Sequence, residues 1–386
     1  MIKSQKVLMR VDYNVPIKNG IIIDLTRIEA TLPTINYLLK NNCQIVLMSH
    51  LGRPKGKDDT LSLKILIKPL EKLLNREVVF FEDIYKEKIE NRMGPGKVGL
   101  LENLRFYTGE LENDINFCKM LSKYGNIYIN DAFGVCHRSH ASTSGIHAFF
   151  ANKIFKGFLL ETELIQLKKL KNSIIKPYTI IVGGSKIGSK IHLLKTFLDI
   201  ADNIIIGGGM AFPFIKHLGG KIGNSICEDG ELDIVESFLK ESADSKTQII
   251  LPKDCLITNN IENKSNQKII DIYSIPDGFL GVDIGPKSLG SFNEIINKSN
   301  LIMWNGPMGI SEIKEFSNGT KCIAEYVKKR TQNGCYSLIG GGDTVSDITR
   351  LGYKKSFSYL STGGGAMLDF FKNENLPGIL GLKKIT

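Results

Sequence analysis

The stretch Asn203-Ile204-Ile205-Ile206-Gly207-Gly208-Gly209 is a short β-branched run that ends in three consecutive glycines. The same order recurs at Thr179-Ile180-Ile181-Val182-Gly183-Gly184 and at Ser337-Leu338-Ile339-Gly340-Gly341-Gly342. Short apolar runs that alternate with longer helical patterns predict parallel strands covered by helices. Open sheets of this kind bind ligands in the crevice beyond the carboxyl ends of their strands. The stretch therefore predicts an α/β fold with a ligand site at its glycine turns.

Further runs of this type continue in both directions, and the residues at their carboxyl ends differ between the two halves of the chain. The early runs end in polar or cationic residues such as Asp12 and His50, whereas the later runs end in glycines. We expect polar and cationic side chains that bind a ligand in the first half, and glycine loops that lead into helices in the second. The expected strands are residues 6–11, 44–48, 98–101, 126–129, 179–182, 203–206, 248–251, 301–304, 337–339 and 358–360.

A segment without internal Gly or Pro, residues 157–167, separates the two sets of strands and predicts a connecting helix. A chain of 386 residues is long enough for two cores of ordinary size. We therefore expect two doubly wound parallel-sheet (Rossmann-like) domains. Residues 1–156 form the first, residues 157–171 a hinge helix, and residues 172–369 the second.

The composition is that of an ordinary globular protein, with 42% hydrophobic and 23% charged residues. No apolar run approaches the roughly 20 residues that span a bilayer, and the amino terminus shows no signal-peptide pattern. The seven cysteines lie far apart without CxxC spacing, which fits reduced thiols better than disulfides or a zinc site. We expect a cytoplasmic protein with no membrane partner.

The net charge of +10 raises the question of nucleic-acid binding. The basic residues are spread along the chain between acids rather than gathered into a stripe, which argues against that partner. Arginine is more informative than lysine, because seven of the nine arginines precede residue 140. A guanidinium binds phosphate or carboxylate in paired hydrogen bonds. The first half therefore predicts an anion site, although Arg10, Arg76 and Arg92 are interpreted as ordinary surface arginines.

The glycine turns predict phosphate binding, because backbone without a Cβ can approach a phosphate closely and the next helix presents free N–H groups. Two familiar nucleotide motifs do not apply. Residues 94–99 match GxGxxG, but they precede an expected strand rather than linking a strand to a helix. No P-loop pattern occurs anywhere in the chain. A nucleotide site here belongs to another class.

Taken together, the strand ends resemble the phosphoglycerate kinase family over essentially the whole chain. The motifs that carry the resemblance are Arg10-Val11-Asp12-Tyr13-Asn14-Val15-Pro16, Ser49-His50-Leu51-Gly52-Arg53-Pro54, Leu101-Glu102-Asn103-Leu104-Arg105-Phe106, Asn130-Asp131-Ala132-Phe133-Gly134 with His137-Arg138-Ser139-His140, Val182-Gly183-Gly184-Ser185-Lys186, Gly207-Gly208-Gly209-Met210-Ala211, Asp283-Ile284-Gly285-Pro286-Lys287, Trp304-Asn305-Gly306-Pro307, Gly340-Gly341-Gly342-Asp343-Thr344 and Ser361-Thr362-Gly363-Gly364-Gly365-Ala366.

The resemblance implies a glycolytic kinase that transfers a phosphoryl group between 1,3-bisphosphoglycerate with ADP and 3-phosphoglycerate with ATP, using Mg²⁺. It implies that the last residues, 370–386, return to pack on the first domain, and a monomer is expected. The implied substrate-binding residues are Asp12, Asn14, Arg27, His50, Leu51, Gly52, Arg53, Arg105 and Arg138. Arg27 would stabilise the charge of the transferring group. His50 is expected to bind the ligand rather than act as a base, because the acceptor oxygen carries no proton to remove.

On the nucleotide side, the resemblance implies Lys186, Lys190, Gly208, Glu312, Gly341, Gly342, Asp343 and Thr344. Lys186 would meet the transferred phosphate, Gly364 would receive it, Glu312 would hold the ribose, and Asp343 would organise the magnesium. Such a transfer depends on position and positive charge, so a hinge closure should bring the two halves together.

The chain departs from the family at Ile310-Ser311-Glu312, where Val-Phe-Glu is usual, which puts the wall of the nucleotide pocket in doubt. Two other functions stay open at this point. One is a catalytically inactive nucleotide-binding regulatory protein of the same fold, which would be expected to lack Arg27, Lys186 or Asp343. The other is a basic nucleic-acid-binding protein, which predicts binding that weakens steeply with salt.

Overall fold

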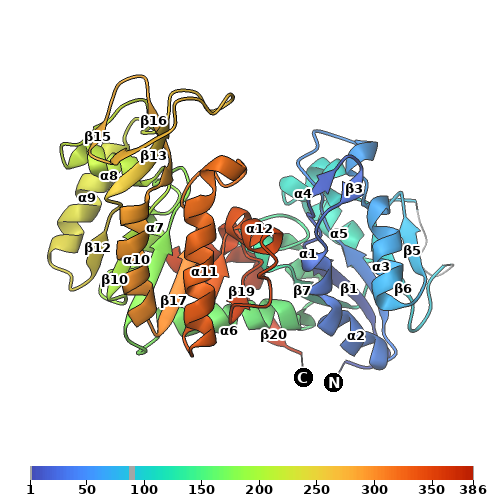
Figure 1. Cartoon of the computed structure of the whole chain (residues 1–386). Coiled ribbons are helices and arrows are strands. Elements are labelled where there is room, and N and C mark those ends of the chain that lie inside the picture. The colour runs from blue at the N-terminus through green and yellow to red at the C-terminus, as the bar shows by residue number, and fades with distance from the viewer. Residues whose placement is uncertain (1, 87–91, 386) are drawn as a thin grey trace. The chain divides into compact units, whose positions relative to one another are not determined.

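The computed structural model describes residues 2–86 and 92–385, and it divides into two compact α/β units. Unit 1 comprises Met1–Ile165 and Asn373–Thr386, and unit 2 comprises Gln166–Lys372. The boundary lies inside helix α6 (Phe158–Lys171). Figure 1 shows the order of the elements by colour.

Unit 1 is built on a seven-stranded sheet with the order β20-β8-β7-β1-β4-β6-β5. Every neighbouring pair in it is parallel. The last strand pairs with β8, so the end of the chain completes the sheet of unit 1. The strands are β1 (Lys6–Val11), β4 (Gln44–Met48), β5 (Val78–Phe81), β6 (Val98–Leu101), β7 (Ile127–Asp131), β8 (Ile154–Lys156) and β20 (Lys383–Lys384).

Helices cover both faces of this sheet, which explains why its strands are apolar without a break. Alternate residues of β1 point to opposite faces: Val7 and Met9 join the core beneath α2 and α3, whereas Leu8 joins the core beneath α5. The helices of unit 1 before α6 are α1 (Thr26–Glu29), α2 (Leu32–Lys40), α3 (Ile67–Leu74), α4 (Thr108–Leu111) and α5 (Ile115–Ser122), and the short strands β2 (Ile17–Lys18) and β3 (Ile21–Ile22) form a hairpin.

Unit 2 is built on a six-stranded parallel sheet with the order β12-β10-β9-β17-β18-β19. Its strands are β9 (Tyr178–Val182), β10 (Asn203–Ile206), β12 (Gln248–Ile250), β17 (Leu301–Asn305), β18 (Tyr336–Gly340) and β19 (Tyr359–Leu360). On one face Trp304 packs with Phe292 and Ile323 of two long helices. On the other, the ring of Phe197 contacts Tyr178 and Phe371 edge to face.

The helices of unit 2 after α6 cover these faces and lead out of the glycine turns. They are α7 (Ile191–Phe197), α8 (Ala211–His217), α9 (Glu231–Ala243), α10 (Pro286–Lys298), α11 (Asn318–Gln332), α12 (Gly342–Arg350) and α13 (Gly365–Lys372). The predicted class, two Rossmann-like parallel-sheet domains, is confirmed.

Unit 2 also carries a small antiparallel sheet that the sequence pattern did not predict. Its order is β14-β13-β16, and a register shift between Leu256 and Ile257 interrupts the pairing of β13 with β16. The added strands are β13 (Asp254–Thr258), β14 (Lys268–Asp271) and β16 (Leu280–Ile284), with β11 (Lys221–Ile222) and β15 (Ser274–Ile275) as a further pair. This sheet supplies one wall of an apolar cavity.

The parallel register gathers the strand ends of each unit at one edge of its sheet. In unit 1, Arg10 pairs with Met48 and Asn130, so the segments after β1, β4 and β7 emerge side by side. In unit 2, Asn305 pairs with Val182 and Gly340, so three glycine turns emerge together. Both predicted half-sites thus lie at the edge where an open parallel sheet binds ligands.

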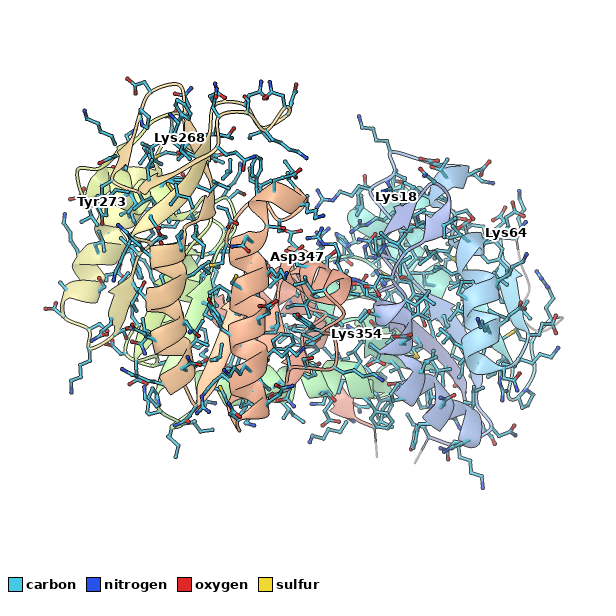
Figure 2. The ribbon with its side chains drawn as sticks, viewed as in Figure 1. Lys18, Lys64, Lys268, Tyr273, Asp347 and Lys354 are labelled. Carbon is cyan, nitrogen blue, oxygen red and sulfur yellow. The ribbon has the colours of Figure 1, made fainter. Side chains whose placement is uncertain are left out.

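The lysine-rich surface is dispersed over both units. Lys18, Lys64 and Lys268, labelled in Figure 2, are exposed side chains of three separate elements or loops. Within residues 2–86 and 92–385, no helix combines the length and apolar character needed to cross a bilayer.

Candidate active site

A cluster of cationic side chains gathers at the strand ends of unit 1 around one carboxylate, Asp12. Arg27, which α1 carries just after the turn held by Asp24, forms an ion pair with Asp12 Oδ2. His50, which comes directly after the loop residue Ser49 beyond β4, lies with its Nδ1 4.0 Å from Asp12 Oδ1. Asp12 and His50 are buried, whereas Arg27 keeps partial exposure. The guanidinium can therefore meet a ligand without leaving its carboxylate partner.

Two further arginines belong to this cluster. Arg105 is buried and donates from Nη1 to the carbonyl of Gly52 at 2.5 Å. Burial, then the like charges of Arg138 and Arg10, lowers the pKa of Arg105 to about 10, so it stays charged near neutral pH. Arg138 donates to His137 Nε2 at 3.1 Å. Mutual repulsion of this kind favours an anion, which relieves it on binding.

Arg53, the fourth predicted arginine, stands apart from these contacts. It is exposed, and among the residues that the structure describes it has no hydrogen bond or ion pair. Its neighbours Leu51 and Gly52 are fixed: Asn103 accepts from Leu51 N at 3.3 Å, and Asn14 Oδ1 accepts from Gly52 N at 2.9 Å. The loop is therefore ordered by side chains of two other strand ends while Arg53 remains free to reach a ligand.

The interpretation of Arg10 as a surface arginine is wrong, because its side chain is only 1% exposed. It donates from Nε to Ser142 Oγ at 2.8 Å, contacts the Val11 carbonyl, and lies with Nη2 3.2 Å from His50 Nδ1. Ser142 in turn donates to buried Glu110 at 2.6 Å. A central strand of a sheet covered on both faces buries every side chain it carries, and that signal was present in the position of Arg10 within residues 6–11.

The protonation states follow from this arrangement. Burial alone would raise the pKa of Asp12, but Arg27, His50 and Arg10 outweigh it and lower that pKa to about 2, so the carboxylate is ionised. For His50, burial and the nearby guanidinium groups of Arg10, Arg105 and Arg27 hold the pKa well below its ordinary value despite Asp12. The imidazole is therefore neutral near pH 7.

In unit 2 a cavity of about 160 Å³ lies where two helices begin. Gly341 precedes α12 with φ of 90°, a left-handed conformation that favours glycine. The free N–H groups of the first turns of α12 and α13 border the same cavity. Of the predicted nucleotide residues, this cavity brings together Lys190, Gly341, Gly342, Asp343, Thr344 and Gly364.

Lys190 is the cation of this cavity. Its Nζ donates to the carbonyl of Gly183 at 2.5 Å and to that of Asn305 at 3.3 Å. A Cβ at Gly306 would collide with the backbone carbonyl of Gly183 as well as with this ammonium group, and the φ of 101° there favours glycine too. Burial lowers the pKa of Lys190 to about 8, against the attraction of Asp343. An ammonium group bonded to carbonyls rather than to a carboxylate is well suited to bind a phosphate.

Asn305 is a candidate binding residue that the sequence analysis did not select. It ends β17, is 2% exposed and lines the cavity, and its Nδ2 has no hydrogen-bond partner among the described residues. A buried amide donor without a partner is costly unless a ligand satisfies it. Its place at a strand end, within a motif already noted, was the signal that could have found it.

A larger cavity of about 330 Å³ adjoins this region and shares Asp343 with it. Gly208, Gly209 and Met308 line one side, and Leu280 and Val282 of the antiparallel sheet line another. The predicted residues Gly208 and Glu312 both border it. Asp283, also in its wall, accepts from Gly319 N at 2.7 Å and holds the start of α11. An apolar slot beside glycines fits a flat aromatic base.

The departure at Ser311 lies behind this wall and not in its lining. Ser311 is buried and does not border the cavity, whereas Ile310 and Glu312 on either side of it do. Its carbonyl accepts from Arg350 at 2.6 Å, and Arg350 also pairs with Asp347 at 2.6 Å. Asp347, labelled in Figure 2, lies in α12. The backbone at Ser311 thus ties the wall to the helix that carries Asp343, through a carbonyl that any residue at this position would supply.

Lys186 is not brought to either cavity. It is exposed and pairs with Glu228 at 2.5 Å, and both side chains remain about half exposed. Ion pairs of this exposure contribute about 0–1 kcal/mol. The side chain can therefore leave Glu228 at little cost when an anion competes for it.

Comparisons with known proteins agree with this arrangement. The family model for phosphoglycerate kinase matches residues 1–374. The chain is 43% identical over 383 residues to the phosphoglycerate kinase of Thermosipho africanus, covering 98% of this chain and 95% of that protein. It is 40% identical over 385 residues to cytosolic phosphoglycerate kinase 3 of Arabidopsis thaliana, covering 99% and 96%.

Solved structures give the same result. The structure of phosphoglycerate kinase from Coxiella burnetii matches with a TM-score of 0.84 at 35% identity, covering 98% of this chain and 96% of that one. That from Pyrococcus horikoshii matches with a TM-score of 0.86 at 31% identity and the same coverage. The ordered strand ends, the two half-sites and these relatives lead to one conclusion: the chain belongs to the phosphoglycerate kinase family.

Proposed function

We propose that this glycolytic kinase binds phosphoglycerate at the arginine cluster of unit 1 and the nucleotide at the glycine-lined cavities of unit 2. The observation that carries the proposal is that the two units offer different kinds of anion-binding group. Unit 1 offers Arg27, Arg105 and a neutral His50 around an ionised Asp12. Unit 2 offers helix starts, a lysine and an apolar slot. The first set suits a compact phosphorylated acid and the second a nucleoside polyphosphate.

In unit 1 the arginines would bind the phosphate and carboxylate of 3-phosphoglycerate or 1,3-bisphosphoglycerate. Arg105, Arg138 and the free Arg53 would hold the non-reacting end, while Arg27 faces the transferring group. Asp12, Asn14, His50, Leu51 and Gly52 would position these groups and the substrate. Support comes from the ion pair of Arg27 and the ordered loop at Gly52. Paired hydrogen bonds from guanidinium groups favour such oxyanions.

In unit 2 the base of ATP or ADP would lie in the apolar slot beside Gly208, with the ribose near Glu312. The phosphates would occupy the smaller cavity at Gly341, Gly342, Thr344 and Lys190. Lys186 would leave Glu228 to meet the transferred group, and Gly364, at the start of α13, would receive it. The cavity that the nucleotide residues line, with its unpartnered Asn305 amide, supports this placement.

The residues present fit a magnesium ion that arrives with the nucleotide. The described part of the chain contains no group of three His, Cys, Asp or Glu side chains that could hold a metal alone. Mg²⁺, however, binds through one carboxylate with phosphate oxygens and water, and Asp343 borders the phosphate cavity. Asp343 would hold the ion there, and the bound ion would supply positive charge to the phosphate oxygens.

The protein's contribution to the transfer would be position and charge. A loose transition state spreads negative charge over three oxygens, which Arg27, Lys186, Lys190 and the N–H groups of α13 would stabilise. The acceptor oxygen is already anionic, so no side chain needs to remove a proton. Reaction requires both ligands within about 3–3.5 Å in line, so we propose that hinge closure through α6 brings them together and excludes water.

We further propose a cytoplasmic monomer without nucleic-acid or membrane partners. The name of the Arabidopsis relative, which calls that protein cytosolic, supports the location. Arg27, Lys186 and Asp343, the residues that the inactive alternative would be expected to lack, are all present. That alternative has no observation in its favour.

A coupled assay tests the function. With 3-phosphoglycerate and Mg-ATP, the purified chain should form 1,3-bisphosphoglycerate, detected by its reduction, and the rate should depend on both substrates. Nucleotide binding without turnover would instead indicate the regulatory protein. A gel shift with DNA at physiological salt should show no complex, and a stable complex there would defeat the exclusion of nucleic acid.

The metal role of Asp343 has its own test. Asp343→Asn keeps the shape of the side chain but removes its charge, so the magnesium concentration for half-maximal rate should rise about tenfold. Glu312→Gln is the matched control, because Glu312 lies in the larger cavity only. It should raise the KM for nucleotide and leave the magnesium curve in place. An unchanged curve for Asp343→Asn would move the metal elsewhere.

A further inference from the structure

The ring nitrogen His50 Nδ1 lies between two groups that would impose opposite proton positions on it. Arg10 Nη2 is 3.2 Å away, and Asp12 Oδ1 is 4.0 Å away. A guanidinium can only donate, whereas an ionised carboxylate can only accept. The nearer group is the arginine, so Nδ1 accepts a hydrogen bond from Arg10 and carries no proton.

The single proton of a neutral imidazole must then be on Nε2. Within the described part of the chain, Nε2 has no hydrogen-bond partner, and it is not one of the side-chain atoms sealed from solvent without one. The donor is therefore available to a ligand. An Nε2–H group attracts an anionic oxygen, while an unprotonated Nε2 would repel it.

Arg10 is held firmly enough to impose this choice. Ser142 Oγ accepts from its Nε at 2.8 Å, and the Val11 carbonyl accepts from Nη1. Ser142 is itself fixed by Glu110, which accepts from the hydroxyl at 2.6 Å and from the backbone N–H at 3.0 Å. All four groups are buried. The guanidinium cannot turn away from His50 without breaking buried hydrogen bonds.

We propose that Arg10 is a positioning residue that fixes His50 as a neutral Nε2–H donor toward the anionic substrate. This rests on the proposed phosphoglycerate site of unit 1. The other charged groups that face His50 are Asp12, Arg105 and Arg27. Without Arg10, the Asp12 carboxylate is the remaining partner for Nδ1 and would draw a proton to it. His50 would then present to the ligand either an unprotonated Nε2, which accepts a hydrogen bond, or an imidazolium whose positive charge is shared with Asp12.

The first test is the tautomer of His50 in the free enzyme, read from the two ring ¹⁵N shifts of the histidine-labelled protein. His50→Gln identifies the signals among the six histidines. We expect unprotonated Nδ1 and protonated Nε2, without titration from pH 6 to 8. An Nδ1–H tautomer, or an imidazolium in that range, would overturn the proposal, and this measurement needs no variant of Arg10 to fold.

The second test compares Arg10→Met with Ser142→Ala. Arg10→Met removes the donor at similar length, so the proton should move to Nδ1 or His50 should titrate within the pH range. The KM for 3-phosphoglycerate should rise about tenfold, the loss expected for one hydrogen bond to a charged group, with kcat changed less than about threefold. Ser142→Ala removes one buried bond of Arg10 but leaves its bond to the Val11 carbonyl and its contact with His50. It should therefore keep the Nε2–H tautomer and raise the KM less than Arg10→Met does.

The outcomes separate this proposal from the proposed function. If Arg10→Met leaves the Nε2–H tautomer and KM unchanged while the assay shows turnover, the positioning role is wrong and the function stands. If the tautomer shifts but no turnover with 3-phosphoglycerate occurs even in the wild type, the proposed function fails on its own. If Ser142→Ala raises the KM as much as Arg10→Met while His50 keeps its Nε2–H tautomer, the rise in KM reflects a general loss of packing and the proposal fails.

Discussion

At the scale of single residues, we expect the largest effect on turnover from substitution of Arg27. Its guanidinium pairs with Asp12 yet stays partly exposed, so it can add a bond to charge that develops on the transferring group. Arg27→Ala should lower kcat by about 10²–10³-fold, with a smaller rise in the KM for 3-phosphoglycerate, because its contact is strongest in the transition state. Steady-state kinetics with each substrate varied provides the measurement.

Arg76→Ala is the control for this variant, since Arg76 is an exposed arginine of unit 1 that donates to the Gly96 carbonyl. It should leave both constants within about twofold. A change in KM alone for Arg27→Ala, with kcat intact, would mean that Arg27 binds the ground state and the transition state equally. Its assigned role would then be wrong.

The lowered pKa of Lys190 predicts that the protein takes up a proton when a nucleotide binds. Its pKa is lowered to about 8, mainly by burial, so at pH 8 about half of the free enzyme has lost this proton. An anionic phosphate beside Nζ favours the charged form and raises the pKa again. Binding of ADP at pH 8 should therefore take up about half a proton, measured by calorimetry in two buffers of different ionisation enthalpy. At pH 6.5 the uptake should vanish.

Lys190→Met supplies the control for that measurement, because it removes the titrating group and leaves the nucleotide's own protonation unchanged. The buffer dependence at pH 8 should disappear in this variant. An equal buffer dependence in wild type and variant would assign the proton to another group and remove the support for Lys190 as the phosphate cation.

Sequence motifs selected most of the residues that the structure gathers at the strand ends of each unit, but not the buried polar groups around them. The positions of Asp12, His50 and Gly341 follow from strand ends, because a parallel register brings such ends together. The buried position of Arg10 and the unpartnered amide of Asn305 were not predicted. Both depend on how the side chains pack in the folded structure. The side-chain direction of Lys186 was equally invisible, since nothing in its motif indicates Glu228 as a partner.

At the scale of elements, the ten predicted strands agree with the structure to within two residues, whereas β5 and several shorter strands were missed. β1, β4 and β6 agree with the predicted runs because both faces of each are covered. β8 and β20 span only three and two residues, too short for a periodic signal. The antiparallel strands β14 and β16 were missed, because charged residues bound the two isoleucines of β14 and Gly281 interrupts the apolar run of β16.

A buried carboxylate at the end of β7, that of Asp131, bonds to the start of helix α6. Its burial predicts an effect of pH on stability. Asp131 accepts from Leu160 N at 3.0 Å, and its pKa is raised to about 7, chiefly by burial. The folded chain thus keeps a proton that the unfolded chain releases near pH 4. This contribution to stability is complete below about pH 4 and is lost as pH rises to about 7.

Asp131→Asn should remove that dependence. Between pH 4 and pH 8 the wild type should lose about 2–4 kcal/mol of unfolding free energy relative to the variant. Urea denaturation followed by circular dichroism measures it. Asp59→Asn, at an exposed position, should show no such shift. Parallel pH profiles for Asp131→Asn and wild type would show that Asp131 is ionised in the folded protein.

At the scale of the whole molecule, the sequence predicted two parallel-sheet units, and the structure and the family membership confirm that fold class. The different ligand chemistry of the two units stays a prediction. The arginines cluster early and the glycine turns late, so each half-site could be assigned to one part of the chain before any coordinates. Which carboxylate, amide or lysine completes each half-site depended on packing within each unit, which composition and periodicity do not encode.

The claim that connects these scales is that each substrate binds one unit and that the reaction needs both at once. A ligand that contacts one unit has little differential affinity for a closed state, so it shifts the equilibrium weakly. Solution scattering on the free protein, on each singly liganded form and on the doubly liganded form measures this directly. We predict similar radii of gyration for the first three samples and a smaller radius for the last; equal radii in all four would contradict the hinge closure.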